Sequence, residues 1–368
     1  MREVLVVGAG PAGLSAGLAL LRAGCAATII EQHASPPPRV CGAFINPEGT
    51  RHLASLQVLE DVVAAGAVPV TAARVTSPNG REAVVPIVRG GLGGLAVPRP
   101  VLEQTLAEAF IRRGGAIRWN ARATAARRVS VGWRLTWREQ GSERELDGAC
   151  LVVADGRYSS LSGRPRARPV AGWFGWNALF NGVPAAPGTL SLHFYRSGYV
   201  GVLTFADGST NVCGLTCDRM VGATGWDEVY AAAIDRQRVL ARLLSGARRV
   251  TPFRGVGPLP FSRAMWPSAG RVLAGDAAAV GDPYLGEGIS RALGTGPALL
   301  PSLAAWADHP DADAIAASYS REWRARYRAR LRLGGVSRAV LARPRLLSAV
   351  LALARPSVLR VLLSVAHR

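Results

Sequence analysis

The chain contains no lysine and few of the residues that build metal centres or disulfide frameworks. All 44 of its basic residues are arginine, set against 25 acidic residues. Its five cysteines are scattered over positions 25, 41, 150, 213 and 217. An odd, scattered set argues against a disulfide framework, and Cys213 and Cys217 have no second pair or histidine nearby to complete a zinc site. We therefore expect no metal centre and a reducing, cytoplasmic setting.

Long hydrophobic runs are also missing. No apolar segment approaches the roughly 20 residues that a membrane-spanning helix requires. The N-terminus enters a strand-like pattern directly, without the basic and apolar regions of a signal peptide, so we expect no leader. The sequence has no internal repeat and no low-complexity segment. With 368 residues, 49% of them hydrophobic, it predicts a globular protein of two closely packed domains.

The positive charge of the chain is concentrated at its C-terminus. From Arg321 to Arg368 there are 12 arginines and a single acid, Glu322, within a total net charge of +19. No basic groove interleaved with aromatics and no known nucleic-acid module accompanies these arginines, so nucleic acid is not an expected partner. A basic, apolar tail suits peripheral contact with an anionic membrane, with Leu346 to Ala354 as its uncharged part. The alternative is a solvated face on helices that pack against the body.

A dinucleotide-binding pattern occupies the first 31 residues. The apolar run Glu3 to Val7 predicts a buried strand, and Gly8-Ala-Gly-Pro-Ala-Gly13 leads from it into an alanine- and leucine-rich helix. A second strand then ends at Glu31. In this pattern the first glycine permits the tight turn, the second lets a pyrophosphate approach the backbone, and the third lets helix and strand pack closely. Glu31 is placed to accept hydrogen bonds from an adenosine ribose.

Two later strands also end in glycine and an acid. Cys150 to Ala154 runs into Asp155-Gly156, and Arg271 to Ala274 runs into Gly275-Asp276. An NAD dehydrogenase has no need of such a distant acid, whereas the longer FAD does, because Asp276 can accept a hydrogen bond from a ribityl hydroxyl. The turn Gly286-Glu287-Gly288 opens a helix whose positive end would face the pyrimidine edge of the flavin. These motifs together predict FAD as the cofactor.

The three motifs, in this order, resemble the flavin signatures of the superfamily that contains p-hydroxybenzoate hydroxylase and geranylgeranyl reductase. The similarity covers roughly residues 1–300 and implies an α/β fold. It predicts a Rossmann-like FAD-binding domain, an inserted antiparallel-sheet substrate domain and C-terminal helices. We expect residues 1–70, 95–163 and 264–305 in the FAD-binding domain, 71–94 and 164–263 in the substrate domain, and 306–368 in a basic helical region. The motifs and the resemblance assign to FAD the residues Gly8, Gly10, Pro11, Ala12, Gly13, Glu31, Gln32, Cys41, Gly42, Arg99, Ala123, Asp155, Gly156, Gly275, Asp276, Pro283, Gly286, Glu287, Gly288 and Ile289.

Two details are similar to the geranylgeranyl-reductase branch. Cys41-Gly42 resembles its Cys-Gly motif beside the flavin ring, and Gly286 to Ile289 resembles its GEGI motif. The alanine-histidine that aromatic hydroxylases usually carry after their GD motif is absent. The reductases' Tyr-x-Trp-x-Phe-Pro substrate motif is also incomplete, because only Tyr199 is matched. Trp173-Phe-Gly-Trp176 resembles the Trp-x-Trp motif of flavin halogenases with a different spacing, but a lysine-free chain lacks their active-site lysine.

The sequence thus predicts an FAD-dependent oxidoreductase that acts on a lipophilic, isoprenoid- or polyketide-like small molecule, as in secondary metabolism. The favoured reaction is hydride transfer from reduced flavin to a C=C bond, with Cys41 as the candidate catalytic proton donor; an inert buried thiol is the alternative reading of Cys41. The alternative reaction is hydroxylation or epoxidation with O2. A more distant alternative is a membrane-associated protein that binds FAD without turnover. The resemblance implies NAD(P)H or another external electron donor.

Overall fold

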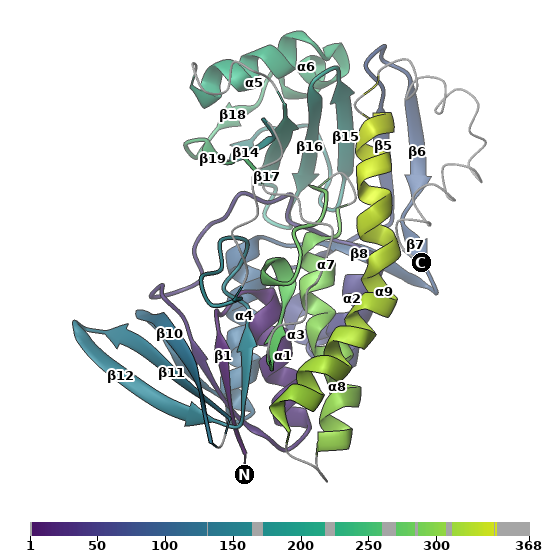
Figure 1. The fold of residues 1–368 in the computed structure, drawn as a ribbon. Coiled ribbons are helices and arrows are strands. Elements are labelled where there is room, and N and C mark those ends of the chain that lie inside the picture. The colour runs from purple at the N-terminus through teal and green to yellow at the C-terminus, as the bar shows by residue number, and fades with distance from the viewer. Residues whose placement is uncertain are drawn as a thin grey trace.

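A five-stranded parallel sheet lies in the lower part of the molecule (Figure 1). The computed structural model describes residues 2–130, 132–163, 172–217, 225–259, 270–283, 286–306, 311–341 and 343. The sheet has the order β20-β13-β1-β2-β9. Its strands are β1 (Glu3–Val7), β2 (Ala26–Ile30), β9 (Ala116–Arg118), β13 (Cys150–Val153) and β20 (Arg271–Leu273). The buried strands expected on either side of the glycine-rich turn and before the two later motifs are therefore confirmed.

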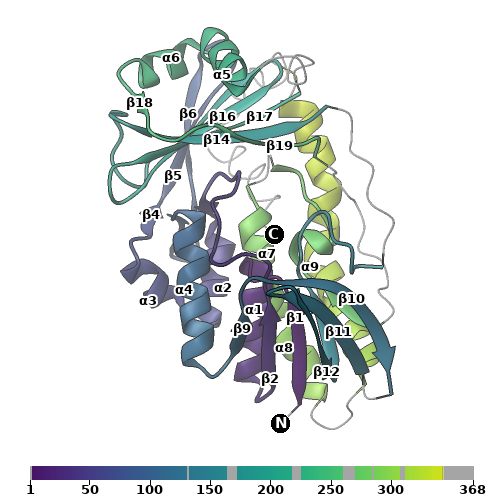
Figure 2. The same ribbon diagram turned by 90° about the vertical axis from the view of Figure 1, so that its left-hand side faces the viewer.

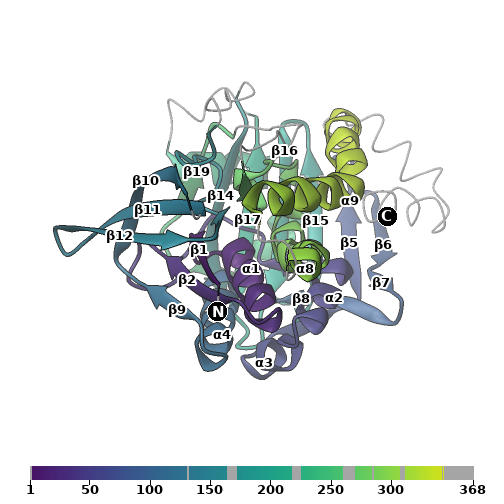
Figure 3. The same ribbon diagram turned by 60° about the horizontal axis from the view of Figure 1, so that its bottom comes forward.

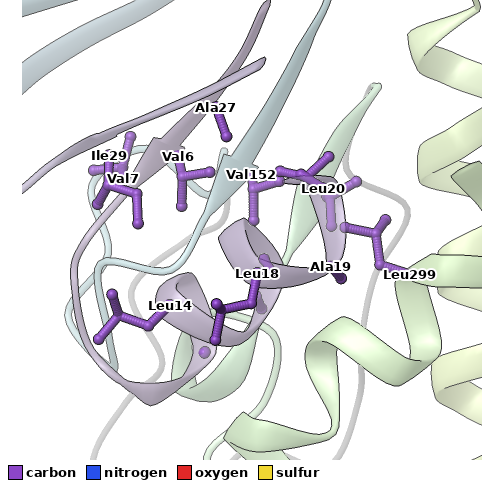
Figure 4. Close-up of a cluster of buried hydrophobic side chains, with 14 of the residues drawn as sticks. Val6, Val7, Leu14, Leu18, Ala19, Leu20, Ala27, Ile29, Val152 and Leu299 are labelled. Atoms are coloured by element: carbon purple, nitrogen blue, oxygen red, sulfur yellow. The ribbon is translucent and has the colours of Figure 1, made fainter. Parts of the chain in front are cut away.

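Helix α1 (Pro11–Arg22) packs its leucines onto this sheet. Leu14 and Leu18 are at most 1% exposed, and Figure 4 shows them with side chains of the neighbouring strands and with Leu299 of α8 (Thr295–Trp306). Burying one such leucine stabilises the fold by roughly 1.5–3 kcal/mol. Gly17 faces the ring of Phe110 in α4 (Arg99–Arg112), where a Cβ would lie 2.7 Å from the ring. Close packing of α1 on both sides thus depends on small residues.

A large, mostly antiparallel sheet forms the upper part of the molecule (Figures 1 and 2). Its order is β18-β14-β17-β16-β15-β5-β6, with β19 paired to β14. The strands are β5 (Ala72–Thr76), β6 (Glu82–Pro86), β14 (Phe174–Asn181), β15 (Leu190–Tyr195), β16 (Gly198–Thr204), β17 (Thr210–Thr216), β18 (Arg248–Arg249) and β19 (Arg254–Val256). Helices α5 (Trp226–Asp235) and α6 (Arg238–Leu244) cover one face, where Trp176 is fully buried. The domain boundaries expected from the sequence stay a prediction.

Two smaller sheets complete the fold, and one of them departs from a sequence expectation. The glycine-rich sequence of residues 89–94 predicts a loop, and this prediction is wrong: β7 (Val88–Arg89) and β8 (Leu92–Ala96) form a hairpin. Gly90 and Gly91 supply positive φ angles of 57° and 79° at its turn, so the glycines mark two turn positions rather than a long loop. Strand β8 also pairs with β3 (Phe44–Ile45) and β4 (Val68–Val70), while β10 (Ala121–Val129), β11 (Gly132–Glu139) and β12 (Ser142–Gly148) form a separate sheet.

The remaining helices flank the two large sheets, as Figure 3 shows from below for α2, α3, α8 and α9. They are α2 (Pro47–Ser55), α3 (Leu59–Ala64), α7 (Gly288–Leu293), α8 (Thr295–Trp306) and α9 (Ala312–Leu341), with a 3-10 turn at Gly275–Ala277. The glycine pair Gly334-Gly335 predicts a break in the C-terminal helical region, and this prediction is wrong, because α9 continues through both residues. Glycine weakens a helix by about 1 kcal/mol but keeps the N–H that a proline removes.

The far C-terminal predictions fall mainly on residues outside the described ranges. Pro344 and Pro356, which predict further breaks in the C-terminal helical region, and the uncharged segment Leu346 to Ala354 belong to that part of the chain. Among the residues that the structure does describe, no helix combines the length and the apolar character needed to cross a membrane.

Candidate functional site

Four neighbouring strands of the parallel sheet each end in one of the sequence motifs. Gly8 follows β1, Glu31 follows β2, Asp155 lies just beyond β13, and Asp276 lies just beyond β20. Because these strands are adjacent and parallel, their carboxyl ends meet at one edge of the sheet. The chain moves from β1 to β2 on one side and to β13 on the other, so β1 marks the point where strand order reverses. Ligands of open α/β sheets bind outside the strands at such a point.

The glycine turn after β1 has the geometry that a pyrophosphate site requires. A Cβ on Gly8, whose φ is +98°, would lie 2.6 Å from the carbonyl oxygen of Ala154. A Cβ on Gly13 would lie 1.9 Å from the carbonyl oxygen of Gly8, so the helix packs directly on the turn. A Cβ on Gly10 would meet no atom within 4 Å. The turn is therefore closed on its protein side and open above Gly10, next to Pro11 at the first position of α1.

Glu31 is held against this turn at the end of β2. Its side chain is buried, and its Oε2 accepts a 2.7 Å hydrogen bond from the backbone N–H of Ala9. Its Oε1 lies 2.6 Å from Nδ1 of His33 and accepts a 3.0 Å hydrogen bond from the His33 N–H. Two carboxylate oxygens offer about four acceptor positions, so capacity remains for ribose hydroxyls. Gln32, which the resemblance also assigned to FAD, is exposed beside it.

The turn after β20 packs against the glycine turn. Gly275 has a φ of +56°, and a Cβ there would lie 2.8 Å from the Cβ of Ala12. Asp276 is partly exposed and faces two guanidinium groups: Nη2 of Arg291 lies 3.3 Å from its Oδ1, and Nη2 of Arg157 lies 3.7 Å from its Oδ2. The two guanidinium groups therefore fix the carboxylate at the strand edge, where its oxygens can accept a hydrogen bond from a hydroxyl.

Asp155 supplies a second acceptor at the same edge. Its Oδ1 is buried and has no hydrogen-bond partner among the described residues. Burial raises the pKa of Asp155, although the hydroxyl of Ser159 and nearby backbone groups oppose that shift. Space is open beyond it, because a Cβ on Gly156 would meet no atom within 4 Å. An unpaired buried oxygen and open space above Gly10 and Gly156 fit a long dinucleotide such as FAD.

The loop that carries Cys41 and Gly42 lies between the two large sheets. Its outer anchor is Asn211 of β17, whose Nδ2 donates a 2.9 Å hydrogen bond to the carbonyl of Cys41. Its inner anchor is Arg99, whose Nη1 lies 3.8 Å from the Cys41 sulfur. Arg99 forms an ion pair with the buried carboxylate of Glu103. Burial disfavours charge on this guanidinium, but the Glu103 carboxylate outweighs that effect and keeps the pKa of Arg99 above its ordinary value.

The GEGI segment lies near the same sheet. Tyr199 of β16 donates a 3.3 Å hydrogen bond to the carbonyl of Pro283, three residues before Gly286. A Cβ on Gly286, whose φ is +61°, would approach the ring of Phe44 to 3.7 Å, and a Cβ on Gly288 would meet nothing within 4 Å. Glu287 and Ile289 are buried. The Cys41 loop and the Pro283 loop are thus both tied to neighbouring strands of the upper sheet.

The face of the upper sheet that meets these loops is mainly apolar. Side chains two residues apart on a strand point the same way, so Asn211 and Tyr199 identify this face. Leu215 of β17 and Leu203 of β16 therefore lie on it, and Leu192 of β15 packs with both. The arrangement can present a lipophilic molecule to the two loops.

The structure brings together nearly all residues that the sequence assigned to FAD. Ala123 is half-buried on β10, two residues after Ala121, whose N–H donates a 2.8 Å hydrogen bond to the carbonyl of Glu31. The sequence reasoning missed Asn211, Arg157 and Arg291. Two signals in the sequence were available. Arg291 is a charged residue inside the apolar helical run after Gly288, and Asn211 is an asparagine within a buried strand pattern. Among the described residues, no group of three or more histidine, cysteine or acidic side chains is placed to hold a metal ion.

Comparison with known proteins identifies the cofactor domain. Residues 1–172 match the model of the FAD binding domain family. The chain is 26% identical over 309 residues to digeranylgeranylglycerophospholipid reductase 2 of Methanopyrus kandleri, covering 79% of this chain and 74% of that protein. The N-terminal part of the chain is therefore an FAD-binding domain, and the protein is an FAD-dependent oxidoreductase.

Solved structures share the whole architecture. The myxobacterial chondrochloren halogenase superposes with a TM-score of 0.82 at 18% identity, over 92% of this chain and 83% of that chain. The p-nitrophenol 4-monooxygenase of Pseudomonas putida superposes with a TM-score of 0.80 at 18% identity, over 99% of this chain and 98% of that chain. These likenesses confirm the predicted fold class: a Rossmann-like FAD-binding domain, antiparallel sheets and C-terminal helices.

Proposed function

We propose that this FAD-dependent oxidoreductase reduces an activated C=C bond of a lipophilic small molecule. The observation that carries the proposal is the Cys41 thiol, which is held by Arg99 between the FAD-binding edge and an apolar sheet face. The relative from Methanopyrus kandleri supports the same reaction class, because its name describes a reductase of a lipid. An isoprenoid- or polyketide-like substrate suits the apolar face.

FAD bound at this edge would supply hydride chemistry at the double bond once reduced, and NAD(P)H or another external donor would be needed to reduce it. The chain itself supplies the proton. The S–H bond of Cys41 breaks as its proton moves to the second alkene carbon, and the sulfur keeps the electron pair. Arg99 then stabilises the resulting thiolate, since its guanidinium lies 3.8 Å from the sulfur. Solvent returns the proton, which balances the cycle.

The neighbouring thiol cannot take this role. Cys213 lies on β17 below the same loop, and a Cβ on Gly42 would be 3.7 Å from its sulfur. Burial raises the pKa of Cys213 to about 12, so it is a poor proton donor at neutral pH. Cys213 therefore offers a matched control for substitutions at Cys41.

Halogenation is not supported by the site. Trp176 belongs to the segment that resembles the Trp-x-Trp motif of flavin halogenases. It packs under α5, and its ring centre lies 6.1 Å from that of Tyr230. That position is on the sheet face opposite the Cys41 loop, and the chain contains no lysine. Oxygen-dependent hydroxylation is the remaining alternative, and the experiment below separates it from reduction.

The test reduces the enzyme without oxygen and then adds a polyprenyl glycerophospholipid or a phenolic polyketide. We expect the flavin to reoxidise anaerobically, with a product heavier by two hydrogens. Cys41→Ser should keep FAD and slow this step by roughly 100-fold, since general acid catalysis typically contributes about 10²- to 10⁴-fold. Cys213→Ser should behave like the unmodified enzyme. Reoxidation only after oxygen is admitted, with one oxygen atom in the product, would establish the monooxygenase instead. No reoxidation by either route would indicate an FAD-binding protein without turnover.

A further inference from the structure

A buried cluster of charges joins the C-terminal helix to the GEGI segment. Arg330 of α9 is 5% exposed, and its Nη1 donates to Oε2 of Glu48 in α2. The same Nη1 lies 3.8 Å from Oε1 of Glu287, which is 4% exposed. One guanidinium thus contacts carboxylates from two segments that are more than 200 positions apart in the sequence.

The surroundings of Arg330 hold it in this position. Its guanidinium stacks over the ring of Tyr327 at 5.5 Å. Burial opposes charge on Glu48, but its bonds to His52 and Arg330 outweigh that effect and lower the pKa of Glu48 to about 2. Glu48 is therefore ionised at neutral pH. Removal of Arg330 would leave a buried carboxylate without its cation, which is strongly unfavourable.

The cluster adjoins the GEGI segment and the first turn of α2. The backbone N–H of Asn46, two residues before Glu48, donates a 3.1 Å hydrogen bond to Oγ of Ser290. A Cβ on Gly49 would lie 2.5 Å from that same Oγ. The first turn of α2 and the start of α7 are therefore packed together, and Arg330 ties both to α9 through their carboxylates.

We infer that Arg330 is a positioning residue of the flavin site, which fixes the Gly286–Ile289 turn and offsets the charge of Glu287. Reduction places negative charge on the pyrimidine part of a flavin, so an uncompensated carboxylate near this turn would disfavour the reduced state. Arg330 supplies the compensating charge from a helix outside the FAD-binding match at residues 1–172. The inference concerns cofactor binding, so it holds for reduction and hydroxylation alike.

The experiment measures FAD affinity and the two-electron midpoint potential of purified variants. Arg330→Met should raise the FAD dissociation constant at least tenfold and lower the potential, and Arg330→Lys should recover part of both. Glu287→Gln alone should raise the potential, because it removes a negative charge. The double variant Glu287→Gln/Arg330→Met should return the potential toward the unmodified value. Arg326→Met is the matched control, since Arg326 lies one turn away and pairs with Glu322.

Opposite shifts from the two single variants are the decisive signature, because a purely structural contact would not produce them. Unchanged affinity and potential in a folded Arg330→Met protein would overturn the inference. Shifts of the same sign in both single variants would also overturn it. If Arg330→Met does not fold, the neutral triple variant Glu48→Gln/Glu287→Gln/Arg330→Met removes the unpaired charges. That variant should bind FAD at least tenfold more weakly; affinity equal to that of the unmodified protein would show that Arg330 only supports the fold.

Discussion

Replacing Gly10 with alanine separates the flavin site from the fold that carries it. Gly10 has φ −75° and ψ 177°, which any residue can adopt, and a Cβ there would meet no protein atom within 4 Å. The apo protein should therefore not be destabilised. The gain of about 0.4–1 kcal/mol from the smaller backbone freedom that alanine loses on folding is opposed by the preference of the N-cap position for glycine over alanine, since Gly10 is the N-cap of α1.

FAD binding should respond in the opposite direction. The added methyl group would occupy the space through which the pyrophosphate approaches the backbone above Gly10. Losing one hydrogen bond to a charged phosphate costs roughly 1.5–3 kcal/mol. At about 1.4 kcal/mol for each factor of ten, the dissociation constant should rise roughly 10- to 100-fold.

Thermal unfolding of the apo protein, repeated at increasing FAD concentrations, measures both effects at once. Gly13→Ala is the contrasting variant, since a Cβ there would lie 1.9 Å from the Gly8 carbonyl oxygen and should destabilise even the apo protein. We expect Gly10→Ala to retain its apo unfolding temperature and to lose most of the FAD-induced increase. A normal FAD-induced increase would refute the assignment of the pyrophosphate to this turn.

Three further predictions follow from other parts of the chain. Asp276→Ala should weaken FAD retention by roughly 10- to 100-fold, measured by equilibrium dialysis, because it removes a carboxylate that accepts a charge-assisted hydrogen bond. Burial lowers the pKa of His193 to about 4 in the folded protein. The unfolded chain binds a proton at this residue below about pH 6.5, whereas the folded protein does so only below about pH 4. Stability should consequently fall by roughly 3 kcal/mol as the pH drops from 6.5 to 4 in denaturant titrations, and His193→Gln should remove this dependence. Truncation after Gly335 should abolish salt-sensitive binding to anionic vesicles if the basic tail contacts membranes, and equal binding by the truncated protein would contradict that idea.

The position of the motifs at one edge of the parallel sheet was predictable because the sequence signals are local. A glycine turn such as Gly8 to Gly13 needs particular backbone angles and close approaches, and few sequences satisfy them in any other way. The acids Glu31, Asp155 and Asp276 are each fixed by the strand that precedes them. Their meeting at one edge then follows from the parallel pairing of β1, β2, β13 and β20.

The parts that the sequence could not predict depend on distant contacts. Arg330 lies among several arginines of α9. Only its contacts with Glu48 of α2 and with Glu287 at the start of α7 distinguish this buried arginine from the exposed Arg328. Strand β10 is rich in alanine, which favours helices, and it forms a strand because it pairs with Trp133 and Trp137 of β11. Asn211 acquires its role only when β17 meets the Cys41 loop.

If the proposal holds, the FAD-binding residues belong to turns of the lower body and the substrate-binding side chains belong to the upper sheet. Side chains of the upper sheet could then change without disturbing the turns that bind FAD. Cys41 is bound by both parts of the molecule: Arg99 of the lower body contacts its sulfur, and Asn211 of the upper sheet donates a hydrogen bond to its carbonyl. Any displacement of one body relative to the other would therefore move this thiol. The identity of residue 41 and of its two anchors, rather than the flavin motifs, is what should distinguish the reaction of this chain from those of its structural neighbours.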